Sequence, residues 1–419
     1  MNKYRPNYHI SPKKGWINDP NGFVYFNNQF HVYAQHNPKD VCWGPMHWLH
    51  FVSEDLINWK QCEISLYPDQ VYDCDLGCFS GSSIVYDNKI YALYTGVANG
   101  KQRQCLAISE DGYTYKKYEH NPIIDERHLP NGYLVSDFRD PKVFEINNKY
   151  YVLCVCRNEN NYSSILLFES EDLINYRFVN VLKSFYDLKK GGMVECPEII
   201  FKDGKCALIY SLQNPTTKGD LYQNSFVVGY QIGTLDVNKG IFTPIGPERE
   251  IDKGFDSYAL QVIEKDNEFY SVSWMSSWGI NYPSKKEGYA GQLSLIKKII
   301  FDDDKLKYQF LENQNTKIIK GKLINDEATI KVNNVLIDFD KVHQTITISR
   351  KNMEDQIIDE DGVIIDSRTF HLSFNEEIKV EYHLDNSCLE ISINDGDAFF
   401  SMINYYHYDD VNVVVNNLK

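Results

Sequence analysis

The sequence predicts an all-β protein: a five-bladed β-propeller followed by a small C-terminal β-sandwich. Three observations support this prediction. A strand–turn–strand unit recurs five times at intervals of about 60 residues, a second phrase recurs in step with it, and the repeat ends near residue 310. Several short strands per unit, with almost no amphipathic helix, are typical of propeller blades. A single β-sandwich with chance similarity is the alternative, and the common phase of the two repeats disfavours it.

The main repeat is an apolar strand, a polar tip and an aromatic strand. Asn and Asp-Gly at such tips supply the positive φ that tight hairpins need. The five tips are Asn27-Asn28, Asp87-Asn88, Asn147-Asn148, Lys202-Asp203-Gly204 and Lys265-Asp266-Asn267.

The second repeat is the phrase Ser-Glu-Asp-Leu-Ile-Asn-Trp at 53–59. It returns as Ser-Glu-Asp-Leu-Ile-Asn-Tyr at 170–176, and a weaker copy occupies 109–115. Each copy falls after an aromatic strand of the main repeat. We therefore expect one propeller domain over residues 1–310.

Residues 316–419 have a different pattern. Alternating strand-like segments at 328–332, 344–348, 378–382 and 389–393 are separated by turns such as Asn394-Asp395-Gly396. This alternation predicts a small antiparallel sandwich. The segment lacks the turns with acidic residues that mark the propeller repeats.

The composition limits the classes of function. The 419-residue chain has a formal net charge of -15, which argues against nucleic acid or an anionic membrane as the main partner. No apolar run reaches the about 18 residues of a membrane helix, and no apolar segment follows the basic start. We expect a cytoplasmic protein whose ten cysteines are free thiols without zinc-site spacing. A homodimer is left open.

The turn before the first strand of each repeat is rich in acids. In a propeller these turns meet around one central channel. The five turns are Asn18-Asp19-Pro20, Phe79-Ser80-Gly81-Ser82, Arg139-Asp140-Pro141, Glu195-Cys196-Pro197-Glu198 and Asp256-Ser257-Tyr258. Four of the five deliver an acid, and gathering like charges is costly without a compensating role. A metal site, a carbohydrate-binding rim and acid–nucleophile catalysis are the roles left open.

Two of these acids have contrasting neighbours. Glycoside hydrolysis needs two carboxyl groups beside the bond, one protonated and one ionised. Glu195 lies between Val194 and Cys196, an apolar and thiol setting that favours the protonated form. Asp19 lies among turn amides at 18, 21 and 22, which hold a carboxylate ionised. Aromatic residues near the turns suit sugar faces, although core packing explains each of them singly.

Four of these motifs, in this order, resemble glycoside hydrolase family 32, the family of invertases, sucrose-6-phosphate hydrolases and fructanases. They are Trp-Ile-Asn-Asp-Pro-Asn-Gly at 16–22, Phe-Ser-Gly-Ser at 79–82, Arg-Asp-Pro at 139–141 and Glu-Cys-Pro at 195–197. The resemblance covers residues of about 4–295 and is faint in the C-terminal segment.

The resemblance implies a retaining β-fructofuranosidase acting on a small fructoside, with no metal or organic cofactor. Asp19 then matches the nucleophile, Glu195 the general acid and base, and Asp140 the transition-state stabiliser. Eight residues match sugar-binding positions of the family: Asn18, Gln35, Trp43, Phe79, Ser80, Arg139, Tyr258 and Trp278.

Three alternatives remain beside this interpretation: a fructo-oligosaccharide hydrolase with the same chemistry, an inverting arabinan-type propeller glycosidase, and a non-catalytic sugar-binding propeller. Sucrose 6-phosphate is the first expected substrate and free sucrose the second. A phosphate needs a nearby cation. Lys39, Lys101 and Arg103 are the candidates by position, and an exposed surface charge is the alternative for each.

Overall fold

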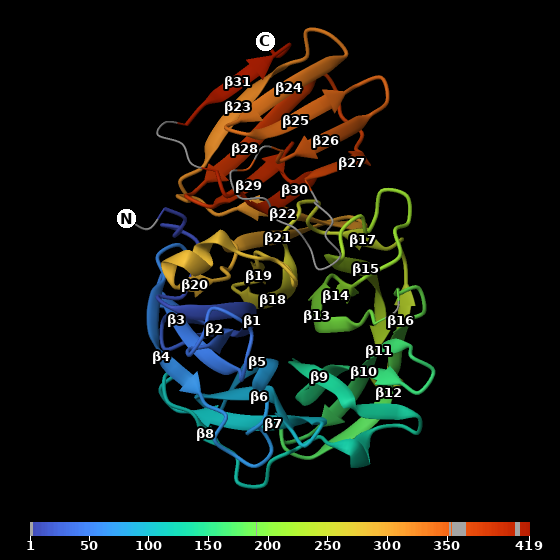
Figure 1. Ribbon diagram of the computed structural model, residues 1–419. Coiled ribbons are helices and arrows are strands. Elements are labelled where there is room, and N and C mark those ends of the chain that lie inside the picture. The colour runs from blue at the N-terminus through green and yellow to red at the C-terminus, as the bar shows by residue number, and fades with distance from the viewer. Residues whose placement is uncertain (1–2, 190, 352, 354–365, 407–410) are drawn as a thin grey trace.

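The computed structural model describes residues 3–189, 191–351, 353, 366–406 and 411–419. Five sheets surround a central channel, and two further sheets form a sandwich against one side of this ring (Figure 1). The predicted all-β fold, a five-bladed propeller followed by a β-sandwich, is confirmed. Within the described residues, no helix is long and apolar enough to cross a membrane.

Each blade is an antiparallel sheet whose strands follow one another outward from the channel. Blade one is β1 (Gly15–Phe26), β2 (Gln29–Asn37), β3 (His47–Ser53) and β4 (Lys60–Leu66). Blade two is β5 (Gly77–Tyr86), β6 (Lys89–Ala98), β7 (Lys101–Ser109) and β8 (Lys116–Lys117). Blade three is β9 (Tyr133–Ile146), β10 (Lys149–Asn158), β11 (Ser163–Ser170) and β12 (Tyr176–Phe185).

The last two blades depart slightly from this plan. Blade four is β13 (Val194–Lys202), β14 (Lys205–Gln213), β15 (Phe226–Asp236) and β16 (Ile241–Pro244), with β17 (Arg249–Glu250) added on β15. Blade five is β18 (Tyr258–Lys265), β19 (Glu268–Trp274), β21 (Lys297–Asp302) and β22 (Lys305–Phe310). Two short 3₁₀ helices, η1 (Glu126–His128) and η2 (Pro283–Glu287), lie in connections.

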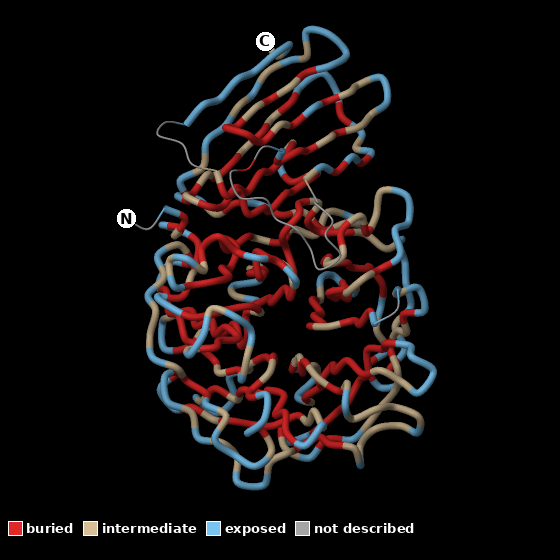
Figure 2. Tube along the Cα trace, in the orientation of Figure 1, coloured by how far each residue is buried: buried red, intermediate tan, exposed pale blue. Residues whose placement is uncertain are grey.

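The ring closes through a strand that returns to blade one. β20 (Tyr289–Ala290) follows the hairpin of β18 and β19 in the chain and pairs in parallel with the start of β1. Gly15 pairs with Tyr289, and Trp16 pairs with Ala290. Buried apolar clusters fill the space between every pair of neighbouring blades, including the pair of blades one and five. Figure 2 shows this burial along the blades, with exposed residues on the outer loops. The blades are therefore held by one continuous circle of hydrophobic contacts.

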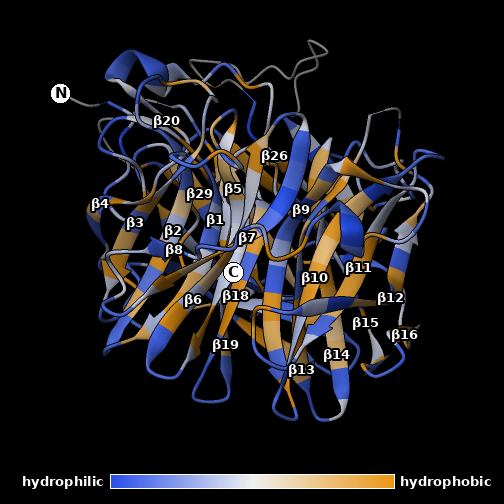
Figure 3. Cartoon of the chain, turned by 90° about the horizontal axis from the view of Figure 1, so that it is seen from below, coloured by the Kyte–Doolittle hydropathy of each residue, from blue (hydrophilic) through white to orange (hydrophobic). Residues whose placement is uncertain are grey.

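Both sequence repeats have a local structural cause. The residues at the hairpin tips adopt positive φ, for example 49° and 61° at Asn27 and Asn28. In the second phrase, the Asp55 carboxylate accepts hydrogen bonds from the backbone N–H of Ile57 and Asn58, and Asp172 does the same in its copy. Each aspartate thus fixes the turn from the third strand to the fourth strand of its blade. Seen from below, hydrophilic residues colour the loops at the strand ends (Figure 3).

The sandwich stacks a four-stranded sheet on a five-stranded sheet. The first sheet holds β23 (Lys317–Lys322), β28 (Glu377–Leu384), β29 (Cys388–Ile393) and β30 (Ala398–Ile403). The second holds β27 (Ser367–His371), β26 (Thr345–Ser349), β25 (Val335–Asp340), β24 (Glu327–Val332) and β31 (Val413–Asn416). Their inner faces share one apolar core, as alternation along the strands predicts.

The N-terminal segment joins the sandwich to the propeller. The fully buried His9 places Nδ1 at 3.1 Å from Asp385 and Nε2 at 3.2 Å from Glu390. Glu390 in turn accepts from Lys297 of the propeller at 3.0 Å. Burial alone would lower the pKa of His9, but Cys388 and the two carboxylates outweigh it and hold that pKa well above its usual range. A buried imidazolium therefore links three parts of the chain.

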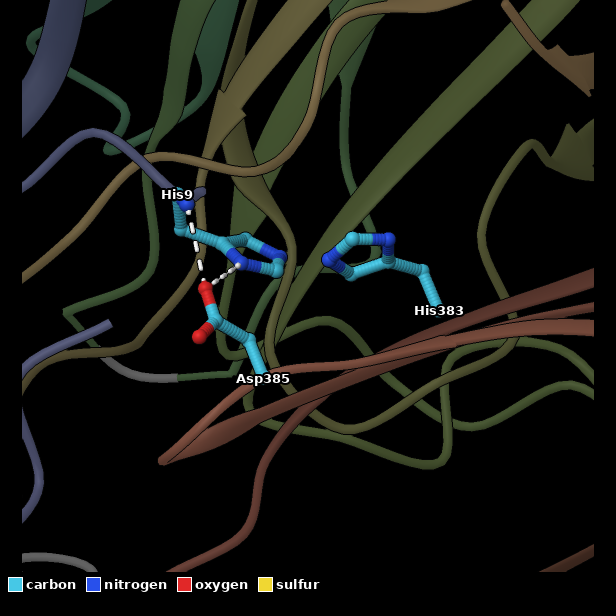
Figure 4. Close-up of side chains that lie close together, drawn as sticks. All are labelled: His9, His383 and Asp385. Atoms are coloured by element: carbon cyan, nitrogen blue, oxygen red, sulfur yellow. Dashed lines mark hydrogen bonds and ion pairs between the residues drawn. The ribbon is translucent and has the colours of Figure 1, made fainter. Parts of the chain in front are cut away.

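His383 lies opposite His9 and Asp385 in this cluster (Figure 4). The three side chains offer ligand atoms within 4.8 Å of one another, as a metal site requires. However, Asp385 already accepts the backbone N–H of Asn7 and Tyr8, both at 2.8 Å, besides the His9 ring. We interpret the cluster as a hydrogen-bonded seam, because its carboxylate is fully engaged by N–H donors.

Candidate active site

The inner strand of every blade is irregular at the level of its acidic or polar turn. A β-bulge bends a strand and re-aims its side chains, and bulges are frequent beside active sites. The register shifts fall between Ile17 and Pro20 in β1, Phe79 and Gly81 in β5, Glu195 and Glu198 in β13, and Tyr258 and Gln261 in β18, and opposite Leu153–Val155 in β9. The five blades therefore turn side chains inward at one level of the channel.

Three of these bulges hold a non-glycine residue in the left-handed region: Asp140 at φ 58°, Cys196 at 45° and Ala259 at 52°. Such residues cost about 1–3 kcal/mol each and persist only where surrounding contacts fix them. The backbone N–H of Asp140 donates to Thr95 Oγ1 and that of Ala259 to Ser211 Oγ, both at 3.0 Å. The preceding blade thus fixes both of these bulges.

Asp19 is half-buried and faces blades two and four. Its Oδ2 accepts from Ser80 Oγ at 2.6 Å, and its Oδ1 accepts from Asn18 Nδ2 at 3.1 Å. The Cys196 thiol donates weakly to Oδ2 at 3.7 Å. Burial and the negative charge of Glu195 raise the pKa of Asp19 to about 6. Asp19 is therefore ionised at neutral pH.

One detail of the Asp19 environment differs from expectation. Asn18 does bind the carboxylate, but Asn21 does not. Asn21 instead donates to the backbone oxygen of Asp19 at 3.0 Å and accepts from the backbone N–H of Gly81 at 3.0 Å. Its amide thus ties blade one to blade two and fixes the turn, while Ser80 supplies the second donor to the carboxylate.

Glu195 lies in a polar setting rather than the apolar one expected from its sequence neighbours. Its Oε1 accepts from Arg139 Nη2 at 3.0 Å and Nε at 3.2 Å. Its Oε2 accepts from Gln213 Nε2 and Tyr258 Oη, both at 2.6 Å. Val194 points into the apolar cluster between blades three and four, because side chains alternate along a strand.

Asp140 is the most enclosed of the three acids, with 5% of its surface exposed. Its Oδ2 accepts the backbone N–H of Cys196 at 3.0 Å. Burial raises the pKa of Asp140 to about 7, the Arg139 guanidinium opposes this shift, and the charges of Glu195 and Asp19 add to it. The three carboxyl groups therefore interact as one cluster, and their proton affinities depend on one another.

Four of the predicted sugar-binding residues donate hydrogen bonds to these acids: Asn18, Ser80, Arg139 and Tyr258. Asn18, Gln35, Ser80 and Tyr258 are buried, while Trp43 is 40% exposed at the rim. Trp43 meets Phe79 edge-on with ring centroids 5.9 Å apart. Trp278 stacks on Trp16 at 6.1 Å. Polar donors and aromatic rings are the residue types that suit a sugar ring.

The fourth acid expected at the rim is not there. Asp256 does not join the rim, because its carboxylate pairs with Arg350 and accepts the backbone N–H of Ile403 at the sandwich. Blade five therefore contributes Tyr258 in place of a fourth acid. Lys101 and Arg103 both pair with Glu126, at 2.7 and 2.8 Å.

The alternation of side chains along β7 explains why Lys101 and Arg103 pair with Glu126. Gln102 lies within 3.3 Å of Arg139 Nη1, so the residues on either side of it face away from the site. Lys39 is exposed and forms no ion pair with any of the described residues.

Sequence reasoning missed Gln213, which ends β14 and reaches Glu195 from the second strand of blade four. It also missed Thr95, whose hydroxyl supports the Asp140 bulge. Both lie on second strands, outside the turns that the repeat singled out. The repeat itself contained a usable signal. Both residues come shortly after the aromatic strand of their repeat, which pairs with the inner strand and so brings them beside its turn.

Comparison with known proteins adds independent findings. The family model for the glycosyl hydrolases family 32 N-terminal domain matches residues 9–310. A sucrose-6-phosphate hydrolase of Escherichia coli is 30% identical, covering 96% of this chain and 89% of that protein. A mutant of the Bombyx mori GH32 beta-fructofuranosidase BmSUC1 in complex with sucrose has a TM-score of 0.84 at 28% identity, covering 100% and 92% of the two chains. A sucrose-6-phosphate hydrolase from Lactobacillus gasseri has a TM-score of 0.86 at 26% identity, with the same coverage.

Proposed function

Because the chain belongs to glycosyl hydrolases family 32 and is a β-fructofuranosidase for sucrose-type substrates, we propose that it works through a covalent fructosyl-enzyme. Asp19 is the nucleophile, Glu195 the general acid and base, and Asp140 the transition-state stabiliser. The observation that carries this proposal is the convergence of these three acids, each with a different set of partners.

In the first step, an Asp19 oxygen forms a bond to the anomeric carbon of the fructosyl unit while the bond to the leaving oxygen breaks. Glu195 gives its proton to that oxygen, so a neutral sugar leaves. In the second step, Glu195 takes a proton from water, the water oxygen attacks the same carbon, and Asp19 leaves as a carboxylate. Two displacements at one carbon retain its configuration.

The environments of the acids fit these roles. Asp19 has a pKa of about 6 and two hydrogen-bond donors, so it is ionised at neutral pH yet remains a good nucleophile. Asp140 is held by a backbone N–H at a strained bulge and presents its carboxylate to sugar hydroxyls. These hydrogen bonds strengthen as positive charge develops on the sugar ring, which lowers the barrier.

Replacement of the two reacting acids tests the mechanism. Asp19→Asn and Glu195→Gln should each lower kcat on sucrose by several orders of magnitude, at unchanged thermal stability. Glu145→Gln on β9 is the matched control, because Glu145 is exposed on the same strand as Asp140. NMR of the first product should show a retained anomeric configuration. Inversion, or near-normal rates in either acid variant, would contradict the assignment.

We place sucrose 6-phosphate first among the substrates and sucrose second, with short fructo-oligosaccharides as the alternative. The names of the relatives support this order. With Lys101 and Arg103 engaged by Glu126, Lys39 is the remaining candidate for the phosphate. Measurement of kcat/KM on sucrose, sucrose 6-phosphate and kestose, in the native enzyme and in Lys39→Ala, tests this choice. Equal values for the first two substrates would remove the phosphate preference.

A further inference from the structure

The two oxygens of the Glu195 carboxylate have chemically different partners. Oε1 accepts two N–H groups of Arg139, and Oε2 accepts one bond each from Gln213 and Tyr258. All four groups on these three residues donate, so the resting arrangement is complementary to a carboxylate. As a general acid, Glu195 must also carry a proton, and the protonated oxygen needs a neighbour that can accept a hydrogen bond.

Only one of the two oxygens can accommodate that proton. A guanidinium has five donors, no acceptor, and does not lose a proton in a protein. A proton on Oε1 would therefore face the N–H groups of Arg139. A hydroxyl such as Tyr258 can rotate to accept, and a primary amide such as Gln213 presents its carbonyl oxygen after a half-turn. The two partners of Oε2 can therefore switch from donating to accepting, so Oε2 is the oxygen that can hold the proton.

The backbone holds Gln213 firmly in this place. Its own N–H donates to Met193 O at 2.8 Å, and its position on β14 pairs with Phe226 of β15. Its carbonyl oxygen would lie 2.6 Å from a Cβ added at Gly192, so only glycine fits beside it. Its backbone is thus clamped on both sides, and a half-turn about the last side-chain bond is the motion that exchanges the donor and the acceptor of its amide.

We propose that Gln213 is a positioning residue for the acid–base step. It fixes Oε2 of Glu195 as the oxygen that delivers the proton to the leaving sugar and recovers it from water, with Tyr258 as its partner. During leaving-group departure the proton moves from Oε2 to the glycosidic oxygen, and the amide then donates to the carboxylate. This inference rests on the acid–base role proposed above for Glu195.

The test compares substrates that differ in their need for a proton. Sucrose needs protonation of its leaving oxygen, whereas 4-nitrophenyl β-fructofuranoside releases a stabilised phenolate without it. Gln213→Met keeps the side-chain length and removes the hydrogen bond. Gln231→Met is the matched control, since Gln231 is a buried glutamine of the same blade that bonds Gly246 O and Lys183.

In Gln213→Met, we expect kcat/KM on sucrose to fall about tenfold or more, with the aryl fructoside changed by less than about twofold. The ratio of the two substrates is independent of the fraction of enzyme that folds.

Two outcomes would overturn the inference: an equal loss on both substrates, which indicates a role in fructose binding, or no loss on either. Glu195→Gln separates this failure from failure of the proposed function. If Glu195→Gln also treats both substrates alike, the acid role itself is wrong. If Glu195→Gln spares only the aryl fructoside while Gln213→Met has no effect, the proposed function stands and Gln213 has no part in it.

Discussion

Replacement of Ser80 by alanine removes the shortest hydrogen bond of the Asp19 carboxylate, which spans 2.6 Å. A hydrogen bond to a charged group contributes about 1.5–3 kcal/mol, and one pKa unit corresponds to about 1.4 kcal/mol. Asp19 keeps Asn18 and is open to solvent on one side, so we take the lower value. The pKa of Asp19 should then rise from about 6 by about one unit.

The assay is the pH profile of kcat/KM on sucrose, which reports groups of the free enzyme. Asp19 must be ionised to attack, so activity falls as pH decreases through its pKa. Ser80→Ala should move this acidic limb up by about one unit and cost about tenfold more at low pH than at the plateau. We choose sucrose and not its phosphate ester as the assay substrate, because the phosphate group itself titrates at a pH of about 6 and would add its own step to the profile.

Ser83→Ala is the control, since Ser83 lies on the same strand as Ser80 and, within the described residues, its hydroxyl forms no hydrogen bond to an acid of the site. It should leave the limb in place. An acidic limb that does not move in Ser80→Ala would refute the reasoning about Asp19. Another group would then govern the loss of activity at low pH, and Asp140, whose pKa is also raised, would be the first candidate.

Three further predictions concern other parts of the molecule. Asp140→Asn should lower kcat on sucrose by about 10²–10³ with little change in KM, as measured by initial rates, because its bonds act mainly in the transition state. His9→Gln should lower the free energy of unfolding by about 3 kcal/mol. The folded pKa of His9 is raised, so this loss should be full below the unfolded pKa and vanish as pH rises through the folded pKa; urea melts at several pH values check this. Lys142→Met should cost about 3 kcal/mol in the same melts by leaving Glu198 buried without its cation, 2.7 Å away, and more at high pH than at low pH. An unchanged midpoint in either variant would contradict the stabilising role of that ion pair.

The five-fold repeat could be predicted because its cause is local. Asn27 and Asn28 need only their own backbone to favour a tight tip, and Asp55 needs only the next three residues to fix its turn. The phase of these signals sets the position of Asp19 and Asp140 around the channel. A repeat with a local cause therefore carries long-range information about which turns meet.

The partners of each acid could not be predicted in the same way. Glu195 has apolar sequence neighbours, yet its surroundings come from Arg139 of blade three and Tyr258 of blade five. Asp256 lies in the corresponding turn of blade five, but its carboxylate pairs with Arg350 of the sandwich, 94 residues away, and does not join the other acids. Such contacts depend on packing between units, which the sequence of one unit does not encode.

The seam at His9 has a consequence for a chain that is still being made. Asp19 leaves the ribosome early, but Ser80 follows 61 residues later and Cys196 177 residues later. His9, ten residues before the nucleophile, is held by groups 376 and 381 residues downstream. Contacts over such separations form late in folding. A nascent or prematurely stopped chain thus exposes its first strand without the neighbours that close the ring, and we expect hydrolysis to begin only after synthesis has delivered the sandwich.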